Sequence, residues 1–299
     1  MKLYLNPDTD SRGIMRVVDA LYKYAPSNVQ VVDNQSESDF EIIHAYGRHD
    51  AIERQTNKLQ KKGKPYAMIQ YAVRSTIRPK ATDWQYMWSR AKVVWSYYDL
   101  FQLLKEDLGD YPSLVKMMEY PPFEFYYAPL GVDPEVFQET SVIKRFIIGA
   151  TSQHALAEGV RECAFASKRV DREMFFLGHE LRRGPDIVCR QNISDEEVGE
   201  YWSQCKYISG LRRVEGFELP VIEGALCGAR PIVFDRPHYR KWFGDFAIFI
   251  PEGPREEVID NLEEIFNHGS FWVSYDEKAI IRERFNWETI ITNFYKKIL

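Results

Sequence analysis

The sequence has no long apolar run and no cysteine pattern typical of a metal site. No stretch reaches the roughly 18 apolar residues that a membrane span needs. The first predicted strand, Lys2–Asn6, begins so early that it leaves no room for a signal peptide. The cysteines have no C-x-x-C pair and no histidine at ligand spacing; they are Cys163, Cys189, Cys205 and Cys227. We expect buried free thiols, a reducing compartment and a cytoplasmic protein, in the host cytoplasm if it is viral.

Positive charge is also scarce. The 39 Lys and Arg residues are outnumbered by 44 Asp and Glu residues, which gives a net charge of −5. This balance argues against a protein that coats nucleic acid, although it leaves a local basic cleft open. The 299 residues exceed one ordinary core and fit two domains of roughly 100–150 residues each.

Short apolar runs alternate with helical periods from end to end, which is typical of parallel α/β architecture. The helical stretches include 14–24, 50–62 and 155–167, and the polar segment 133–142 is the best linker. The expected strands are 2–6, 29–32, 40–44, 66–70, 92–95, 125–128, 145–149, 174–177, 187–189, 207–209, 231–234 and 247–250. We expect two facing Rossmann-like domains, with ligands at the carboxyl ends of their sheets.

Two glutamates flank the predicted start of a helix in the second half. Glu215 lies in the preceding loop, and Glu223 lies about one turn inside the helix, which has Pro220 in its first turn. The amides near Gly216 and Phe217 point out of the helix N-terminus, which favours an anion such as a diphosphate. Carboxylates at these two positions could bracket a nucleotide sugar. For two isolated glutamates, a loop surface residue and a solvated helix residue are the better interpretation.

The segment around these glutamates resembles the E-x7-E signature of retaining glycosyltransferase family 4, E-G-F-x-L-P-x-x-E-A-x-A-x-G followed by P-x-V. The matching residues are Glu215, Gly216, Phe217, Leu219, Pro220, Glu223, Gly228 and Pro231. Segments 129–133, 193–198 and 284–288 are also similar to the family. The resemblance covers 129–299, and over 1–128 it is only topological.

The resemblance implies a GT-B fold, an enzyme that moves a hexose from a nucleotide diphosphate sugar with retention, and no cofactor. It divides the chain into an acceptor domain (1–138), a donor domain (139–284) and a final helix (285–299) that packs back on the first domain. Glu215 would contact the donor sugar and Glu223 the ribose. Gly13 and Gly149 lie where the family's glycine loops approach the donor.

The sequence departs from the family in its diphosphate-binding loop. The family's arginine and lysine are absent from the run 149–159, and positive charge is needed where the leaving diphosphate develops negative charge. Arg212 and Arg213, just before Glu215, are the expected substitutes, although a surface pair of arginines is an equally good interpretation. The Asp8-Thr9-Asp10 triplet is interpreted as turn chemistry, and no residue set has metal-ligand spacing. We therefore expect metal-independent catalysis.

The acceptor side is the least familiar part of the sequence. Tyr71 lies near the position of the family's acceptor-side histidine, and His44 is an alternative, although a structural role is the more ordinary one for a histidine. Basic residues Arg74, Arg78 and Lys80 precede an aromatic group, a mixture that suits single-stranded nucleic acid, a flipped base or a sugar chain. A solvated loop followed by core tryptophans is the simpler interpretation. The aromatic and basic residues that follow are Trp84, Tyr86, Trp88 and Arg90, and a second basic group is Arg236, His238, Arg240 and Lys241.

The function expected from the sequence is glycosyl transfer to a glycan. One alternative is a viral-type DNA base glycosyltransferase that acts on hydroxymethylated bases. The other is a non-catalytic nucleotide-sugar or glycan-binding module, which the missing arginine and lysine make plausible.

Overall fold

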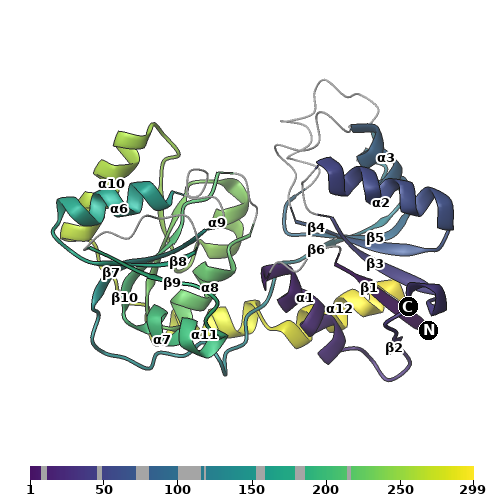
Figure 1. Ribbon diagram of the computed structural model, residues 1–299, viewed down its shortest axis with the longest axis horizontal. Coiled ribbons are helices and arrows are strands. Elements are labelled where there is room, and N and C mark those ends of the chain that lie inside the picture. Colours follow the sequence, from purple (N-terminus) through teal and green to yellow (C-terminus); the bar gives the residue numbers. More distant parts are fainter. Residues whose placement is uncertain are drawn as a thin grey trace. The chain divides into compact units, whose positions relative to one another are not determined.

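The computed structural model describes residues 1–7, 12–45, 49–71, 81–99, 116–117, 119–152, 159–178, 186–213 and 217–299, with backbone alone for 49–53, 62, 81–83 and 152. The chain divides into two compact units (Figure 1). The first comprises Met1–Leu130 with Phe217 and Trp287–Leu299. The second comprises Gly131–Val214 and Glu218–Asn286.

The first unit is built on a six-stranded parallel sheet in the order β2-β1-β3-β4-β5-β6. Its strands are β1 (Lys2–Asn6), β2 (Gln30–Val31), β3 (Phe40–Ala45), β4 (Tyr66–Gln70), β5 (Ala91–Ser96) and β6 (Glu124–Tyr127). Its helices are α1 (Arg12–Lys23), α2 (His49–Lys62), α3 (Ala81–Arg90) and α12 (Trp287–Ile298). Figure 1 shows α2 and α3 on one face of this sheet and α1 and α12 on the other.

Helices on both faces explain why β3 and β4 are buried along their whole length. The C-terminal helix α12 is tied to the first unit by specific bonds. Tyr295 Oη donates to the carbonyl of Leu21 at 2.8 Å, and Tyr126 Oη donates to the carbonyl of Ile290 at 2.7 Å. The last helix of the chain therefore completes the core of the first sheet.

The second unit contains a six-stranded parallel sheet in the order β12-β11-β10-β7-β8-β9. Its strands are β7 (Phe146–Ser152), β8 (Met174–Gly178), β9 (Ile187–Arg190), β10 (Cys205–Gly210), β11 (Arg230–Phe234) and β12 (Ile248–Ile250). Its helices are α6 (Val160–Arg169), α7 (Asp195–Ser203), α8 (Leu219–Leu226), α9 (Pro237–Phe243), α10 (Arg255–His268) and α11 (Tyr275–Arg284).

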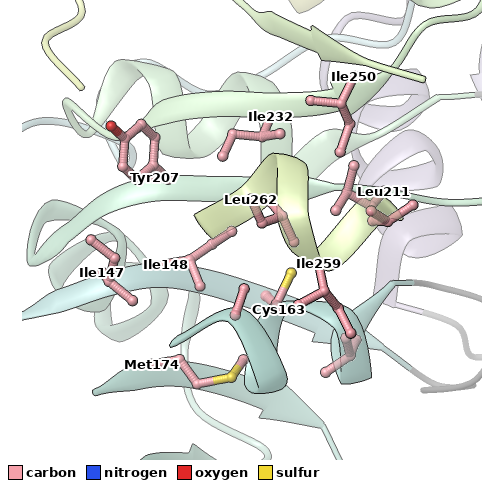
Figure 2. Packing of buried hydrophobic residues seen from close by; sticks show 14 of the residues in the cluster. Ile147, Ile148, Cys163, Met174, Tyr207, Leu211, Ile232, Ile250, Ile259 and Leu262 are labelled. Carbon is pink, nitrogen blue, oxygen red and sulfur yellow. The ribbon is translucent and has the colours of Figure 1, made fainter. Parts of the chain in front are cut away.

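One buried cluster joins this sheet to α6 and α10 (Figure 2). Ile148, Ile232 and Ile250 point from three strands toward Cys163 of α6 and Leu262 of α10. Continuous apolar runs such as that of β7 are what a strand covered on both faces requires.

The two sheets confirm the predicted α/β class, and each of the twelve predicted strands is present, with ends shifted by at most three residues. Two local predictions were wrong. β7 runs on to Ser152, so Gly149 lies inside a strand and not at a turn. The following helix begins at Val160 and not at residue 155; residues 153–158 lie outside the described part.

Local sequence features explain where several helices begin and end. Ser194 caps α7 in a reciprocal capping box with Glu197, and Pro220 lies in the first turn of α8. Gly63 and Gly228 follow helices with φ of 61° and 82°, a region that L side chains rarely adopt. These positions therefore need glycine for backbone reasons.

The four cysteines are free, and three of them are buried while Cys189 is half-buried. Burial raises the pKa of the Cys163 thiol to about 12. Within the described segments, no helix has both the length and the apolar character of a membrane span.

Candidate functional site: the carboxyl edge of the second sheet

Charged residues follow three neighbouring strands of the second sheet. Arg212 and Arg213 come just after β10, Arg236 comes after β11, and Glu252 comes after β12. Because parallel strands end at the same edge of a sheet, these side chains are brought to one place. The structure shows how they are paired.

Arg212 is paired with the most deeply buried of the three glutamates. Its Nε lies 2.6 Å from Oε2 of Glu218, and the two side chains are only 12% and 1% exposed. Tyr239 Oη donates to the other oxygen of Glu218 at 3.2 Å. Arg212 also donates from Nη2 to the carbonyl of Thr151 at 3.4 Å. This pair is buried and held on both sides.

Arg213 is held more loosely. Its Nη1 lies 3.2 Å from Oε1 of Glu162, its Nε lies 4.0 Å from Oε1 of Glu252, and 26% of its side chain is exposed. Its guanidinium lies over the ring of Phe234, 4.9 Å from the ring centre. A cation over an aromatic face is stabilised without being bonded to it.

Arg236 holds the backbone of Arg213 in place. Its Nε and Nη2 donate to Oε2 of Glu252 at 2.9 and 2.6 Å, and its Nη2 also donates to the carbonyl of Arg213 at 2.8 Å. The base of the Arg213 side chain is therefore anchored.

These residues form what we call the arginine–glutamate set: Arg212, Arg213, Arg236, Glu162, Glu218 and Glu252. Its three positive and three negative charges balance. Of the six, the sequence predicted a role for Arg212 and Arg213 and noted Arg236, but it missed the three glutamates. Their one visible signal is that Glu218 and Glu252 closely follow strand-end loops, which is also true of many surface residues.

Glu223 occupies the middle of α8 and is 3% exposed. The interpretation of this residue as a solvated helix residue is therefore wrong. The next residue, Gly224, lets α8 approach β10 closely, since a Cβ there would lie 2.8 Å from the Cβ of Ile208. A larger residue would push the helix and its buried carboxylate away from the sheet.

The other predicted donor residues are placed as follows. Glu215 and Gly216 lie outside the described residues. Phe217 is buried, and its ring centre lies 5.5 Å from that of Tyr97, with which it is grouped in the first unit. Gly13 is the second residue of α1. Gly149 is accounted for by packing, because a Cβ there would lie 2.7 Å from the Trp202 ring.

In the first unit, His44 and Tyr71 lie together at the carboxyl ends of β3 and β4. His44 Nδ1 lies 2.8 Å from Tyr71 Oη, and their rings are stacked with centres 5.8 Å apart. Burial lowers the pKa of His44 to about 3 and raises the pKa of Tyr71 well above its ordinary value. Both groups are therefore neutral near pH 7. His44 Nε2 has no hydrogen-bond partner in the described structure.

The predicted basic and aromatic acceptor group is divided by the structure. Arg74, Arg78 and Lys80 lie outside the described residues. Trp84 and Trp88 are fully buried, which confirms that they are core residues.

The second basic group follows the carboxyl end of β11, and two of its arginines are paired with carboxylates. Arg236 is buried against Glu252. Arg240 Nη2 donates to Oδ2 of Asp235 at 2.6 Å. Among the residues whose positions are described, no three His, Cys, Asp or Glu side chains could hold a metal ion.

Solved structures share this fold over essentially the whole chain. The Anabaena protein HepE in complex with UDP matches with a TM-score of 0.69 at 12% identity, over 99% of both chains. Sucrose-phosphate synthase from Thermosynechococcus elongatus matches with a TM-score of 0.73 at 10% identity, over 99% of this chain and 98% of its own. AviGT4, a glycosyltransferase involved in avilamycin A biosynthesis, matches with a TM-score of 0.62 at 12% identity, over 99% and 96%. No protein-family model matches the sequence, and a search of curated proteins found no match.

Proposed function

We propose that the protein is a nucleotide-sugar-dependent glycosyltransferase whose donor site is the carboxyl edge of the second sheet. The observation that carries this proposal is the arginine–glutamate set at the carboxyl edge of the second sheet, where nucleotides bind in open parallel sheets, together with the buried Glu223 of α8. Its support from comparison is the fold shared with HepE, which was solved with UDP, and with AviGT4.

In this proposal the donor is a nucleotide diphosphate hexose, with a uridine nucleotide as the first candidate. Glu223 accepts hydrogen bonds from the ribose, and Glu215 contacts the hexose. Amides at Gly216 and Phe217 approach the phosphates closely. Arg212 or Arg213 supplies positive charge as the bond between the sugar carbon and the phosphate oxygen breaks. Such charge lowers the barrier only where the leaving group becomes more negative.

The configuration at the transferred carbon is proposed to be retained, on the motif resemblance, and the diphosphate is met by arginines without a metal ion. The acceptor is proposed to be a glycan. Neutral groups such as His44 and Tyr71 suit a hydroxyl better than a phosphate backbone, because neither carries charge near pH 7. Arg240, which a DNA track would need as a free cation, is paired with Asp235.

A thermal-shift screen with UDP, GDP, ADP and TDP tests the donor site. A nucleotide that binds only the folded protein, present at a concentration of a hundred times its dissociation constant, stabilises the folded state by about 2.7 kcal/mol. We expect a rise in the unfolding temperature with one of the four and none with uridine at the same concentration. No rise with any nucleotide would contradict the proposal.

A second measurement distinguishes an enzyme from a binding module. Slow hydrolysis of the matching nucleotide sugar without acceptor is expected of a transferase and not of a module. Glu215→Gln should lower turnover far more than donor affinity, as for a contact made mainly in the transition state. Equal turnover in this variant and the wild type would show that Glu215 is misassigned.

A further inference from the structure

We propose that Arg213 alone of the two adjacent arginines binds the donor diphosphate, and that Glu162 is its counter-ion in the ligand-free protein and is exchanged for phosphate when the nucleotide binds. The inference rests on the proposed function and deepens it. It assigns different roles to Arg212 and Arg213, and it makes Glu162 an internal competitor of the substrate.

The two arginines differ in how firmly they are held. Arg212 meets Glu218 at 2.6 Å, and withdrawing it would leave a carboxylate that is 1% exposed without its cation. An uncompensated buried charge is among the most unfavourable defects in a protein. Glu162 is also buried, with 7% of its side chain exposed, but Arg213 meets it at the longer distance of 3.2 Å and keeps more than twice the side-chain exposure of Arg212. Arg213 is therefore the arginine that can leave its partner.

Glu162 tolerates the exchange because of its place in α6. It lies in the first turn of this helix, whose N-cap is Gly159. The partial positive charge of a helix N-terminus stabilises a carboxylate there, even when no cation faces it. The guanidinium can move to a phosphate while the helix continues to stabilise the carboxylate.

The surroundings of Arg213 favour a side chain that swings from a fixed base. Arg236 holds the Arg213 carbonyl at 2.8 Å, and the Phe234 ring supports the guanidinium. Glu252 lies 4.0 Å from Arg213 but is already bonded to Arg236 at 2.6 Å. The charges of the arginine–glutamate set balance without a ligand, and a diphosphate adds negative charge to it. When Arg213 binds the diphosphate, Glu162 is therefore the carboxylate that loses its contact with Arg213.

Calorimetric titration with UDP, or with whichever nucleotide the wild type binds, tests the exchange. We expect Glu162→Gln to tighten diphosphate binding by about threefold to tenfold, because the competing carboxylate is gone; this equals about 0.7 to 1.4 kcal/mol. Arg213→Gln should weaken it by about tenfold or more. In the double variant, the gain in affinity from Glu162→Gln should vanish, since the effects of substitutions at two interacting side chains are not additive.

The matched control is Glu173→Gln, which removes an equal charge from the same unit at the exposed pair with Arg145. We expect no change in affinity there, and none for uridine with Glu162→Gln. A gain in binding cannot come from a misfolded variant, so this arm does not depend on stability.

Three results would overturn the exchange while leaving the donor site intact. They are wild-type or weaker affinity in Glu162→Gln, an equal gain in Glu173→Gln, and a gain that persists when Arg213 is absent. Failure of the wild type to bind any nucleotide diphosphate would remove the proposed function and this inference together.

Discussion

The carboxyl edges of the two sheets carry opposite kinds of chemistry. At the described part of the first edge, the buried His44 and the half-buried Tyr71 form a pair that is neutral near pH 7. At the second edge, Arg212, Arg213 and Arg236 are each paired with a glutamate. Both sheets are parallel and six-stranded, so the architecture is the same and the residues placed after each strand make the difference.

This contrast indicates how one architecture can serve two substrates. In the proposed function, the neutral pair of His44 and Tyr71 suits a hydroxyl-bearing acceptor, since burying neutral groups costs far less than burying ions. A balanced ionic edge suits an anion, because arginines that are already desolvated and oriented need little rearrangement to meet phosphate. The following predictions test whether the two edges really behave as a neutral and an ionic site.

The largest expected effect is on stability at the ionic edge. Arg212→Met leaves the buried Glu218 without its cation and should destabilise the protein by about 3 kcal/mol or more. Urea unfolding monitored by circular dichroism measures this loss of stability. Adding Glu218→Gln should recover part of the loss, since a neutral amide needs no counter-ion. A loss below about 1 kcal/mol would show that Arg212 is not structural.

At the neutral edge, His44 should make the protein sensitive to acid. Its pKa in the folded protein is about 3, below the ordinary value of 6.5. The unfolded chain binds the extra proton between these values, so stability present above pH 6.5 falls as the pH falls toward 3.

The expected loss from His44 between pH 7 and pH 5 is about 2 kcal/mol, at 1.36 kcal/mol per unit below the ordinary pKa. In His44→Gln, which has no titrating ring, unfolding free energies measured at both pH values should differ by correspondingly less. Identical pH dependence in the variant and the wild type would mean that folding does not lower the pKa of His44.

A smaller effect concerns affinity at the ionic edge. Glu223→Ala should weaken nucleotide diphosphate binding by about tenfold or more, because a hydrogen bond to a charged group contributes roughly 1.5–3 kcal/mol. Calorimetry on a folded variant measures it, and Glu264→Ala, an exposed glutamate of α10, is the control. Unchanged affinity in Glu223→Ala would remove this residue from the site.

The smallest expected effect is that of chelation, which should leave transferase activity unchanged because arginines and helix amides meet the diphosphate. The measurement is turnover in EDTA with and without added manganese. Complete loss that manganese restores would mean that a metal ion belongs to the ionic edge.

Much of the fold could be predicted because its signals are local. The apolar runs predicted every strand in the described residues, and the capping box of Ser194 and Glu197 at the start of α7 is built from residues three positions apart. Predictions failed where a distant group decides the outcome. Gly149 was predicted to end a strand. A glycine is needed there for another reason, because the ring of Trp202, more than fifty residues later, packs against this position.

The sequence by itself determined the elements, the parallel architecture and the position of Arg212 and Arg213 at a strand end, since these depend on periodicity and near neighbours. Only the tertiary structure decided the partners. Glu162 lies 51 positions before Arg213, while Glu218 lies six after Arg212, and nothing in their spacing assigns one carboxylate to each guanidinium. The assignment depends on which chain segments the sheet brings to one edge and on how deeply each group is buried there, because burial controls the strength of a charge pair.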